Sequence, residues 1–202
     1  MKLIMENWRR FLISEKMKTS MKTPEDLKDL KHEDGEHLWV IFHEGKRSAE
    51  FFITTEDQPS EPLLGGISVI KPADGNCGGA WMVGMVEAQE GWGPFLYDIA
   101  MEWTTINGGG LMPNRKEVSS AARRVWDFYL NNRDDVKSHQ LDKEDGELTD
   151  DPSDDCGQFS AGMDDMERTT DWVASSLSKR YTKSPPSVIE QVKSNGSWMK
   201  WK

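Results

Sequence analysis

The feature that most constrains the fold is a change of hydrophobic period near the middle of the chain. Four runs rich in β-branched and aromatic residues come first, at 38–43, 50–55, 64–70 and 80–87. Their short connections, several of them glycine-bearing, predict an antiparallel meander of strands. The next apolar residues recur at helical spacing instead: Phe95, Ile99, Trp103 and Ile106. Strand-like runs followed by a run of helical spacing predict an α/β (α+β) fold.

Further elements follow the first helix, which Gly108 to Gly110 should end. A short strand is expected at 111–113. Ser119 or Ser120 can cap a second helix, whose apolar stripe contains Ala122, Val125, Trp126, Tyr129 and Leu130. A third helix is expected around 165–181, a short one at 188–193, and a strand-like tail at 198–202.

The two ends of the chain differ from this centre. Residues 1–15 read as a short amphipathic helix with Leu3 or Ile4, Trp8, Phe11 and Leu12 on one stripe. Residues 16–36 show no sustained period and are expected to be a flexible linker. The folded domain is then expected to span 37–202. Within it, the acidic loop 142–157 is expected to be exposed and mobile because of its density of negative charge. A calcium site is not expected there, because the loop lacks the register of an EF-hand.

Charge and composition exclude several classes of protein. The formal charge of −10 disfavours nucleic-acid binding. No apolar run is long enough to span a membrane, and residues 1–15 do not form a secretory signal. The two cysteines, Cys77 and Cys156, do not form a CxxC pair, and Cys156 reads as a bystander. These features favour a reducing cytoplasm, and no metal site is expected.

The stretch most suggestive of chemistry is the turn at 88–93, which joins a strand to a helix. Glycines there allow a close approach of the backbone, and the first amides of the helix point at the ligand with the helix dipole behind them. A pyrophosphate would suit such a turn. A plain tight turn is the alternative, and the turn alone does not decide between them.

The order strand, glycine turn, helix, short strand and helix resembles the GNAT N-acetyltransferase superfamily. Gly91 and Gly93 match the two glycines of its Gln/Arg-x-x-Gly-x-Gly/Ala pattern, and the segment 119–126 matches its later helix in outline. The resemblance implies a mixed, mostly antiparallel sheet flanked by helices. It also implies acetyl-CoA as the cofactor, with its pyrophosphate held by a contiguous segment: Val86, Ala88, Gln89, Gly91, Trp92, Gly93 and Pro94.

The catalytic residues of that family are matched less well. Ala88 occupies the Gln/Arg position, with Gln89 displaced by one, and Trp126 replaces the tyrosine that acts as an acid. Tyr129 is a candidate replacement acid, and Glu87 is the best-placed candidate base for an amine substrate. The alternative for Glu87, a solvent-facing strand residue, stays open.

A second resemblance concerns the N-terminus. Residues 5–15 (MENWRRFLISE) resemble the leaders of proteins that are packaged inside the heads of large tailed phages. That resemblance implies docking to the scaffold core, cleavage after Glu15 by the prohead protease, and a location in the host cytoplasm and the virion head. Lys16 departs from the small residue usual after the cleavage position.

Two functions therefore remain open. The first is a phage-encoded, acetyl-CoA-dependent N-acetyltransferase-like protein that acts on a small-molecule or protein amine. The second is a non-catalytic phage head protein that uses the same fold as a cargo or interaction domain.

Overall fold

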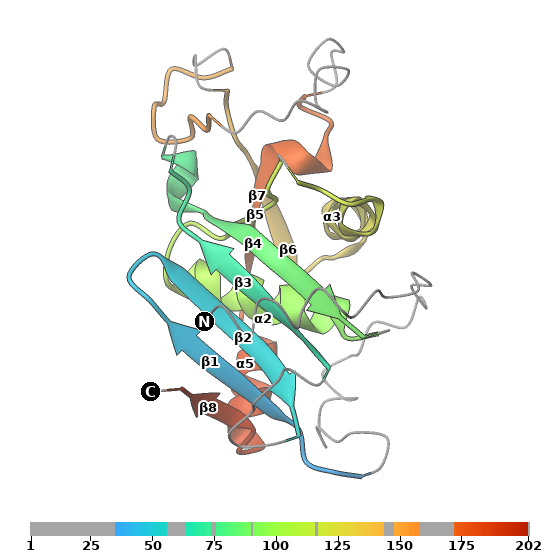
Figure 1. Cartoon of the computed structure of the whole chain (residues 1–202). Helices are drawn as coiled ribbons and strands as arrows, with labels where there is room; N and C mark the ends of the chain where they lie inside the picture. Colours follow the sequence, from blue (N-terminus) through green and yellow to red (C-terminus); the bar gives the residue numbers. More distant parts are fainter. Residues whose placement is uncertain are drawn as a thin grey trace. The chain divides into compact units, whose positions relative to one another are not determined.

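The computed structural model shows an α/β protein with one mixed sheet of eight strands (Figure 1). The strand order is β6-β7-β5-β4-β3-β2-β1-β8, and the α-helices among the described residues are α2, α3 and α5. The residues that the structure describes are 35–55, 64–73, 76–89, 91–115, 117–143, 148–157 and 172–201. The predicted leader 1–15 and the linker up to residue 34 lie outside them. The chain divides into two compact units.

The first unit comprises the described residues of Met1–Val69, Gly84–Ala100 and Pro186–Lys202. It is built on a hairpin of β1 (Trp39–Glu44) and β2 (Ser48–Thr54), which pair in antiparallel fashion. β8 (Trp198–Lys200) adds to β1 in parallel, and β3 (Gly65–Ile70) follows β2. The predicted meander and the strand-like tail are therefore confirmed.

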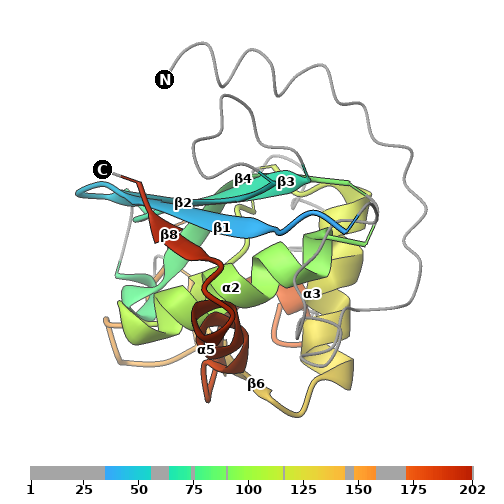
Figure 2. The ribbon, with the colours of Figure 1, turned by 90° about the horizontal axis from the view of Figure 1, so that it is seen from below.

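Aromatic side chains form the core on one face of this hairpin. The rings of Phe42 and Phe51 stack at 5.2 Å, and the Trp198 ring lies 5.7 Å from that of Phe42. Helix α5 (Ser187–Ser194) lies on this face, since Lys193 Nζ lies 5.5 Å from the centroid of the Trp198 ring. Figure 2 shows α2 (Gly93–Ile106) and α5 on the same side of β1 and β2. Both faces of the hairpin are apolar, but the helices cover one of them.

The second unit is Ile70–Val83 and Met101–Pro185. The first residues of β4 (Trp81–Ala88) pair in parallel with β5 (Leu111–Met112), through Trp81↔Leu111 and Met82↔Met112. β7 (Lys179–Lys183) is antiparallel to β5 and to β6 (Val136–Gln140). The predicted second helix is α3 (Ser120–Asn132), and the Ser119 hydroxyl caps it by accepting a hydrogen bond from Ala122 N at 3.1 Å. The mixed character of the sheet comes from its two parallel pairings.

The glycine run after α2 has a packing reason beyond ending the helix. A Cβ at Gly109 would lie 1.8 Å from the carbonyl oxygen of Gly78. Gly110 has a φ of +100°, and a Cβ there would lie 2.3 Å from the carbonyl oxygen of Tyr181. The run therefore lets the backbone pass close to two other segments of the second unit.

One predicted helix is wrong over the residues that the structure describes. Of the expected helix at 165–181, residues 172–175 contain a turn, Ser176–Ser178 is a 3₁₀ turn, and Tyr181 lies in β7. The stripe that suggested a helix is not a buried face, because Val173 is 56% exposed while Leu177 and Tyr181 are buried. Pairing with β6, a strand that no pattern predicted, overrides the local preference here.

Trp81, Trp103 and Trp126 are buried, whereas Trp39 is only partly buried. Among the described residues, no helix is long and apolar enough to cross a membrane.

Candidate functional site

The candidate site is the turn between β4 and α2, which lies in the first unit. Gln89 N donates to the carbonyl of Leu64 at 2.9 Å, so the turn begins where the β3–β4 pairing ends. Trp92 N donates back to the carbonyl of Gln89 at 3.1 Å, which closes the turn. Gly91 has a φ of +88°, and a Cβ there would meet nothing within 4 Å. Glycine is therefore required at this position by backbone conformation and not by lack of space.

The start of α2 presents backbone donors at this turn. Leu96 N donates to the carbonyl of Trp92 at 3.1 Å, so the first intrahelical bond is in place. The preceding amides in the first turn have no acceptor within a helix, and Pro94 carries no N–H. The remaining donors are Gly93 N and Phe95 N, and no residue in this first turn is acidic. The positive end of the helix dipole is therefore not neutralised by a side chain of that turn.

Two further features define the surroundings of these donors. Trp92 is 8% exposed and packs edge-on against Phe95, with ring centroids 5.7 Å apart. A Cβ at Gly93 would lie 4.0 Å from the Cβ of Ala88, which is ordinary contact. The aromatic pair fixes the turn, while position 93 has room for a side chain.

Glu87, the candidate base, precedes this turn on β4. Its side chain is partly buried, and this burial raises the pKa of its carboxyl group above the ordinary value. β3 approaches closely here, because a Cβ at Gly65 would lie 2.5 Å from the Glu87 carbonyl oxygen. A carboxyl group of raised pKa is a stronger base than an ordinary glutamate, which suits the role of proton acceptor.

Most of the predicted site residues belong to one segment of the first unit, and one belongs to the second unit. Glu87 and the predicted cofactor residues form one continuous segment of the first unit, namely Val86, Ala88, Gln89, Gly91, Trp92, Gly93 and Pro94. Tyr129, the candidate acid, lies in the second unit. It is 1% exposed, with the guanidinium of Arg133 at 5.4 Å from its ring centroid.

Trp126, at the family's tyrosine position, and Tyr97, a further tyrosine on α2, are also buried. Trp126 is 1% exposed, and its ring lies 5.1 Å from that of Tyr181. Tyr97 is 3% exposed, and burial raises the pKa of its phenol well above the ordinary value. These three side chains act as core residues.

The acidic segment is more ordered than the sequence suggested. Asp142 is fully buried and accepts hydrogen bonds from three backbone amides: Lys143 N at 2.6 Å, Leu148 N at 2.8 Å and Thr149 N at 2.7 Å. The expectation of a solvated loop is correct for Leu148 to Ser153, which are exposed, but wrong for Asp142. The one clue in the sequence to the burial of Asp142 is the apolar Leu141 directly before it, which is itself buried.

Among the described residues, one cluster of carboxylates has the spacing of a metal site. It consists of Asp142, Asp154 and Asp155, which each offer an oxygen within 4.8 Å of the others. The amides already bind both oxygens of Asp142. Asp154 accepts a hydrogen bond from Thr149 Oγ1 at 3.1 Å. Its negative charge favours the protonated form of the nearby Arg180 guanidinium. Internal hydrogen bonds thus account for Asp142 and Asp154, and the expectation of no metal stays a prediction.

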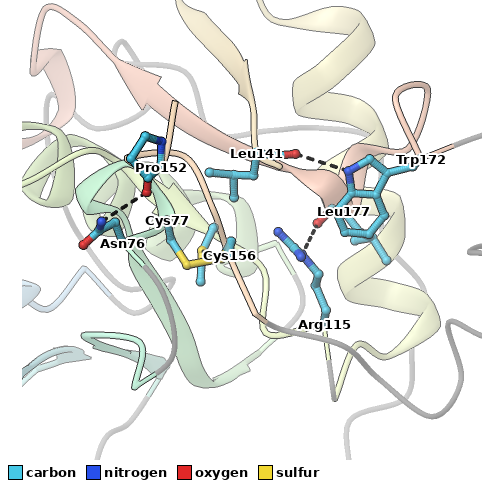
Figure 3. Close-up of a disulfide and its surroundings, with 9 residues drawn as sticks. Asn76, Cys77, Arg115, Leu141, Pro152, Cys156, Trp172 and Leu177 are labelled. Carbon is cyan, nitrogen blue, oxygen red and sulfur yellow. Dashed lines mark hydrogen bonds between the residues drawn. A yellow bond between two sulfur atoms is a disulfide. The ribbon is translucent and has the colours of Figure 1, made fainter. Parts of the chain in front are cut away.

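A disulfide joins the base of this segment to the turn before β4 (Figure 3). Cys77 and Cys156 are both fully buried. The backbone supports the link, because Cys77 N donates to Asp155 O at 2.9 Å and Gly78 N to Ser153 O at 2.7 Å. The interpretation of Cys156 as a bystander is wrong. Because the two cysteines form a disulfide, they no longer favour a reducing compartment, and the cytoplasmic location stays a prediction.

Beyond the disulfide, Figure 3 shows Arg115 and Trp172 in contact. Arg115 Nε donates to Leu177 O at 3.0 Å while its guanidinium lies 4.7 Å from the Trp172 ring centroid. Trp172 Nε1 donates to Leu141 O at 3.2 Å. These contacts fix the segment before β7 and have no evident catalytic use.

Comparison with known proteins adds no relative to this description. No family model matches the chain, and neither a curated protein nor a solved structure matches it.

The Asp142 contacts predict a pH-dependent contribution to stability. Burial alone would raise the pKa of Asp142, but the amides of Thr149, Lys143 and Leu148 outweigh it and hold the pKa below the ordinary value of 3.8. A carboxyl group with a lowered pKa in the folded state stabilises the fold above its unfolded pKa. This stabilisation is lost as the pH falls through the folded pKa.

We expect Asp142→Asn to lower the unfolding free energy by about 1.5–3 kcal/mol at neutral pH, because an amide group would face backbone donors. The difference from the wild type should shrink as the pH falls below 3.8. Urea unfolding at a series of pH values measures this, with Asp150→Asn, at an exposed position, as the control. A loss that is independent of pH would contradict the assignment.

Proposed function

We propose that the turn 88–94 binds the pyrophosphate of acetyl-CoA, and that the protein is an N-acetyltransferase-like protein. The observation that carries this proposal is the conformation of Gly91 directly before the start of α2. It places the amides of Gly93 and Phe95 at the positive end of a helix whose first turn holds no acidic residue. A doubly charged anion gains both hydrogen bonds and the dipole at such an end.

The order of elements supports the same proposal. The segment runs from β4 through the turn and α2 to β5 and α3, which is the order of the GNAT superfamily. β5 is parallel to β4, as a helical crossover between neighbouring strands requires. Trp126 stands where that family has its tyrosine acid, so this position does not supply an acid.

The chemistry proposed for the site needs few groups of the protein. The turn binds and orients the thioester, and an amine attacks its carbonyl carbon. The new C–N bond forms, the C–S bond breaks, and the thiolate leaves. Glu87 accepts the proton of the amine through a water molecule, which its raised pKa favours.

The decisive experiment compares Gly93→Glu with Gly93→Gln in calorimetric titrations with acetyl-CoA. The two side chains have the same size, and position 93 has room for them. At about 5 Å and an effective dielectric constant of about 20, one added charge costs about 3 kcal/mol against each phosphate charge. Binding of acetyl-CoA should therefore weaken by at least about 100-fold in Gly93→Glu relative to Gly93→Gln, even if only one phosphate charge lies this close.

Desulfo-CoA and ATP serve as controls for the ligand, and thermal unfolding serves as the control for the fold. A glutamate near a helix start is favourable to the helix, so Gly93→Glu should remain folded. Equal affinities of the two variants would remove the pyrophosphate from this turn.

A non-catalytic phage head protein is the second candidate function. The specific observation in its favour is the burial of Tyr97, Trp126 and Tyr129, which leaves no exposed side chain at the positions considered for the acid. On this reading the domain is cargo that residues 1–15 deliver to the scaffold, with cleavage after Glu15. Absence of acetyl-CoA binding at millimolar concentration in the wild type would favour this candidate.

A further inference from the structure

A short segment of the second unit, residues 148–156, is held at both of its ends, and we call it the strap. At its start, Leu148 N and Thr149 N donate to Asp142 Oδ2 at 2.8 Å and 2.7 Å. At its end, Cys156 belongs to the disulfide (Figure 3). The strap is therefore attached through a buried carboxylate at one end and through a covalent bond at the other.

Between these two attachments, the strap packs little of its own surface. Residues 148–153 are exposed, and Cys156 is the one fully buried residue of the strap. Its middle is held by the hydrogen bond from Asn76 Nδ2 to Pro152 O at 3.1 Å and by two backbone bonds from the turn 77–79. A segment with few buried apolar contacts opens locally at a low cost in free energy. The order of the strap therefore depends mainly on its two attachments.

The turn to which the disulfide fixes the strap has a strained backbone. Cys77 has a φ of +46°, and no other residue with a Cβ has a positive φ in the described part of the chain. Gly78 and Gly79 follow with φ values of +60° and +72°. A left-handed conformation is unfavourable for a residue with a Cβ, and it persists only where the surrounding contacts enforce it. Breaking the disulfide removes one of these restraints, which favours separation of the turn from the strap.

The disulfide is closed to solvent while the strap is in place. Cys77 and Cys156 are both 0% exposed, and Cys156 Sγ lies 3.8 Å from Met112 Sδ. Thiol–disulfide exchange requires a thiolate to reach one of the two sulfur atoms. Reduction of the folded protein therefore requires the strap to lift first. The hydrogen bonds of Asp142 oppose that movement, because they hold the start of the strap.

We propose that the strap is a redox-controlled segment, which a dithiol reductant releases and to which Asp142 controls access. A thiolate of the reductant attacks one sulfur of the disulfide to form a mixed disulfide, and its second thiol then displaces the remaining cysteine. The reductant is oxidised to its own disulfide, two electrons pass to the protein, and Cys77 and Cys156 each gain one proton. The strap is then free, while β6 and β7 keep their pairing.

Release of the strap changes the availability of a negatively charged segment. The strap carries four carboxylates: Asp150, Asp151, Asp154 and Asp155. An oxidising compartment keeps them attached to the second unit, and a reducing compartment makes them available to a partner. This inference does not depend on the acetyl-CoA proposal, since the strap, the disulfide and Asp142 all belong to the second unit.

Hydrogen exchange followed by mass spectrometry tests the release on the full-length chain. Dithiothreitol without denaturant should reduce the disulfide and raise the exchange rates of the strap and of the turn 77–79 by at least about tenfold. Peptides from β6 and β7 should keep their protection at the same labelling times. The variant Cys77→Ala with Cys156→Ala is the control, and its strap should exchange fast with or without the reductant.

Three results of that experiment would each overturn the proposal. The first is a strap whose exchange does not change on reduction. The second is a loss of protection in β6 and β7 as large as that in the strap, since the disulfide would then stabilise the whole unit and not one segment. The third is a disulfide that dithiothreitol does not reduce in the folded protein.

The role of Asp142 is measured by the rate of reduction. Asp142→Asn should raise the rate at which dithiothreitol reduces the folded protein about tenfold, because a hydrogen bond to a charged group no longer opposes lifting of the strap. Asp150→Asn, at an exposed position of the strap, is the matched control and should leave the rate unchanged. Equal rates in the two variants would overturn the control of access by Asp142.

Low concentrations of urea distinguish lifting of the strap from unfolding of the whole chain. A local opening exposes little surface, so the rate of reduction should change little with urea. A steep rise of the rate with urea would show that reduction requires global unfolding, and it would overturn release of the strap from a folded chain.

Discussion

Replacing Glu102 by Leu is expected to lower the unfolding free energy by about 3–5 kcal/mol, one of the largest effects of any single change in this protein. Glu102 Oε1 lies in direct contact with Lys183 Nζ, and the two side chains are 0% and 1% exposed. Removing the carboxylate leaves an ammonium group buried in the second unit. Asp135 lies 3.7 Å from the same Nζ and compensates only in part, because it is 41% exposed and already binds Arg133.

A double-mutant cycle separates the pair from its surroundings. Lys183→Met should be destabilising by a similar amount, since it strands Glu102. The double variant Glu102→Leu with Lys183→Met should recover most of the loss, because apolar replacements of similar volume often match a buried ion pair. Urea unfolding followed by tryptophan fluorescence measures all four proteins. Additive losses in the double variant would show that the two charges do not depend on each other.

Removing the disulfide is expected to lower the unfolding free energy by about 4 kcal/mol, on the loop-closure argument. Cys77 and Cys156 are separated by 79 positions, so their link restricts a large loop in the unfolded chain. The variant Cys77→Ala with Cys156→Ala keeps the site apolar, which suits its contact with Met112. The hydrogen bonds of Asn76, Cys77 and Gly78 to residues 152–155 should then be lost more easily.

Reducing agent provides the matched control for this change. Dithiothreitol with denaturant should lower the unfolding midpoint of the wild type and leave that of the double-alanine variant unchanged. If the variant and the oxidised wild type unfold at the same urea concentration, the link does not stabilise the fold.

The local pattern of the sequence was sufficient for most of the elements. The hairpin strands, α2, α3 and α5 each bury a face whose period appears directly in the sequence. Ser119 was identifiable as a cap because a hydroxyl before a helical stripe satisfies a free amide within three residues. The site turn was found for the same reason, since Gly91 and Gly93 act through the backbone of their own segment.

Interactions between distant segments could not be read in this way. β6 and β7 exist because residues 136–140 and 179–183 pair across about forty positions, and a strand of mixed polar residues has no period of its own. The partners of Cys77 and of Glu102 lie 79 and 81 positions away along the chain. No local sequence pattern identifies such a partner, because the contact depends on the path of the whole chain.

The sequence by itself therefore determined the class of fold, the elements with a clear period and the position of the glycine turn before α2, because these depend on periodicity and on backbone chemistry over a few residues. Only the tertiary structure decided that Asp142 is buried, that the two cysteines pair, and that Tyr97 and Tyr129 are core residues. Burial and long-range pairing are properties of what packs against a residue, and that is settled only when distant segments meet.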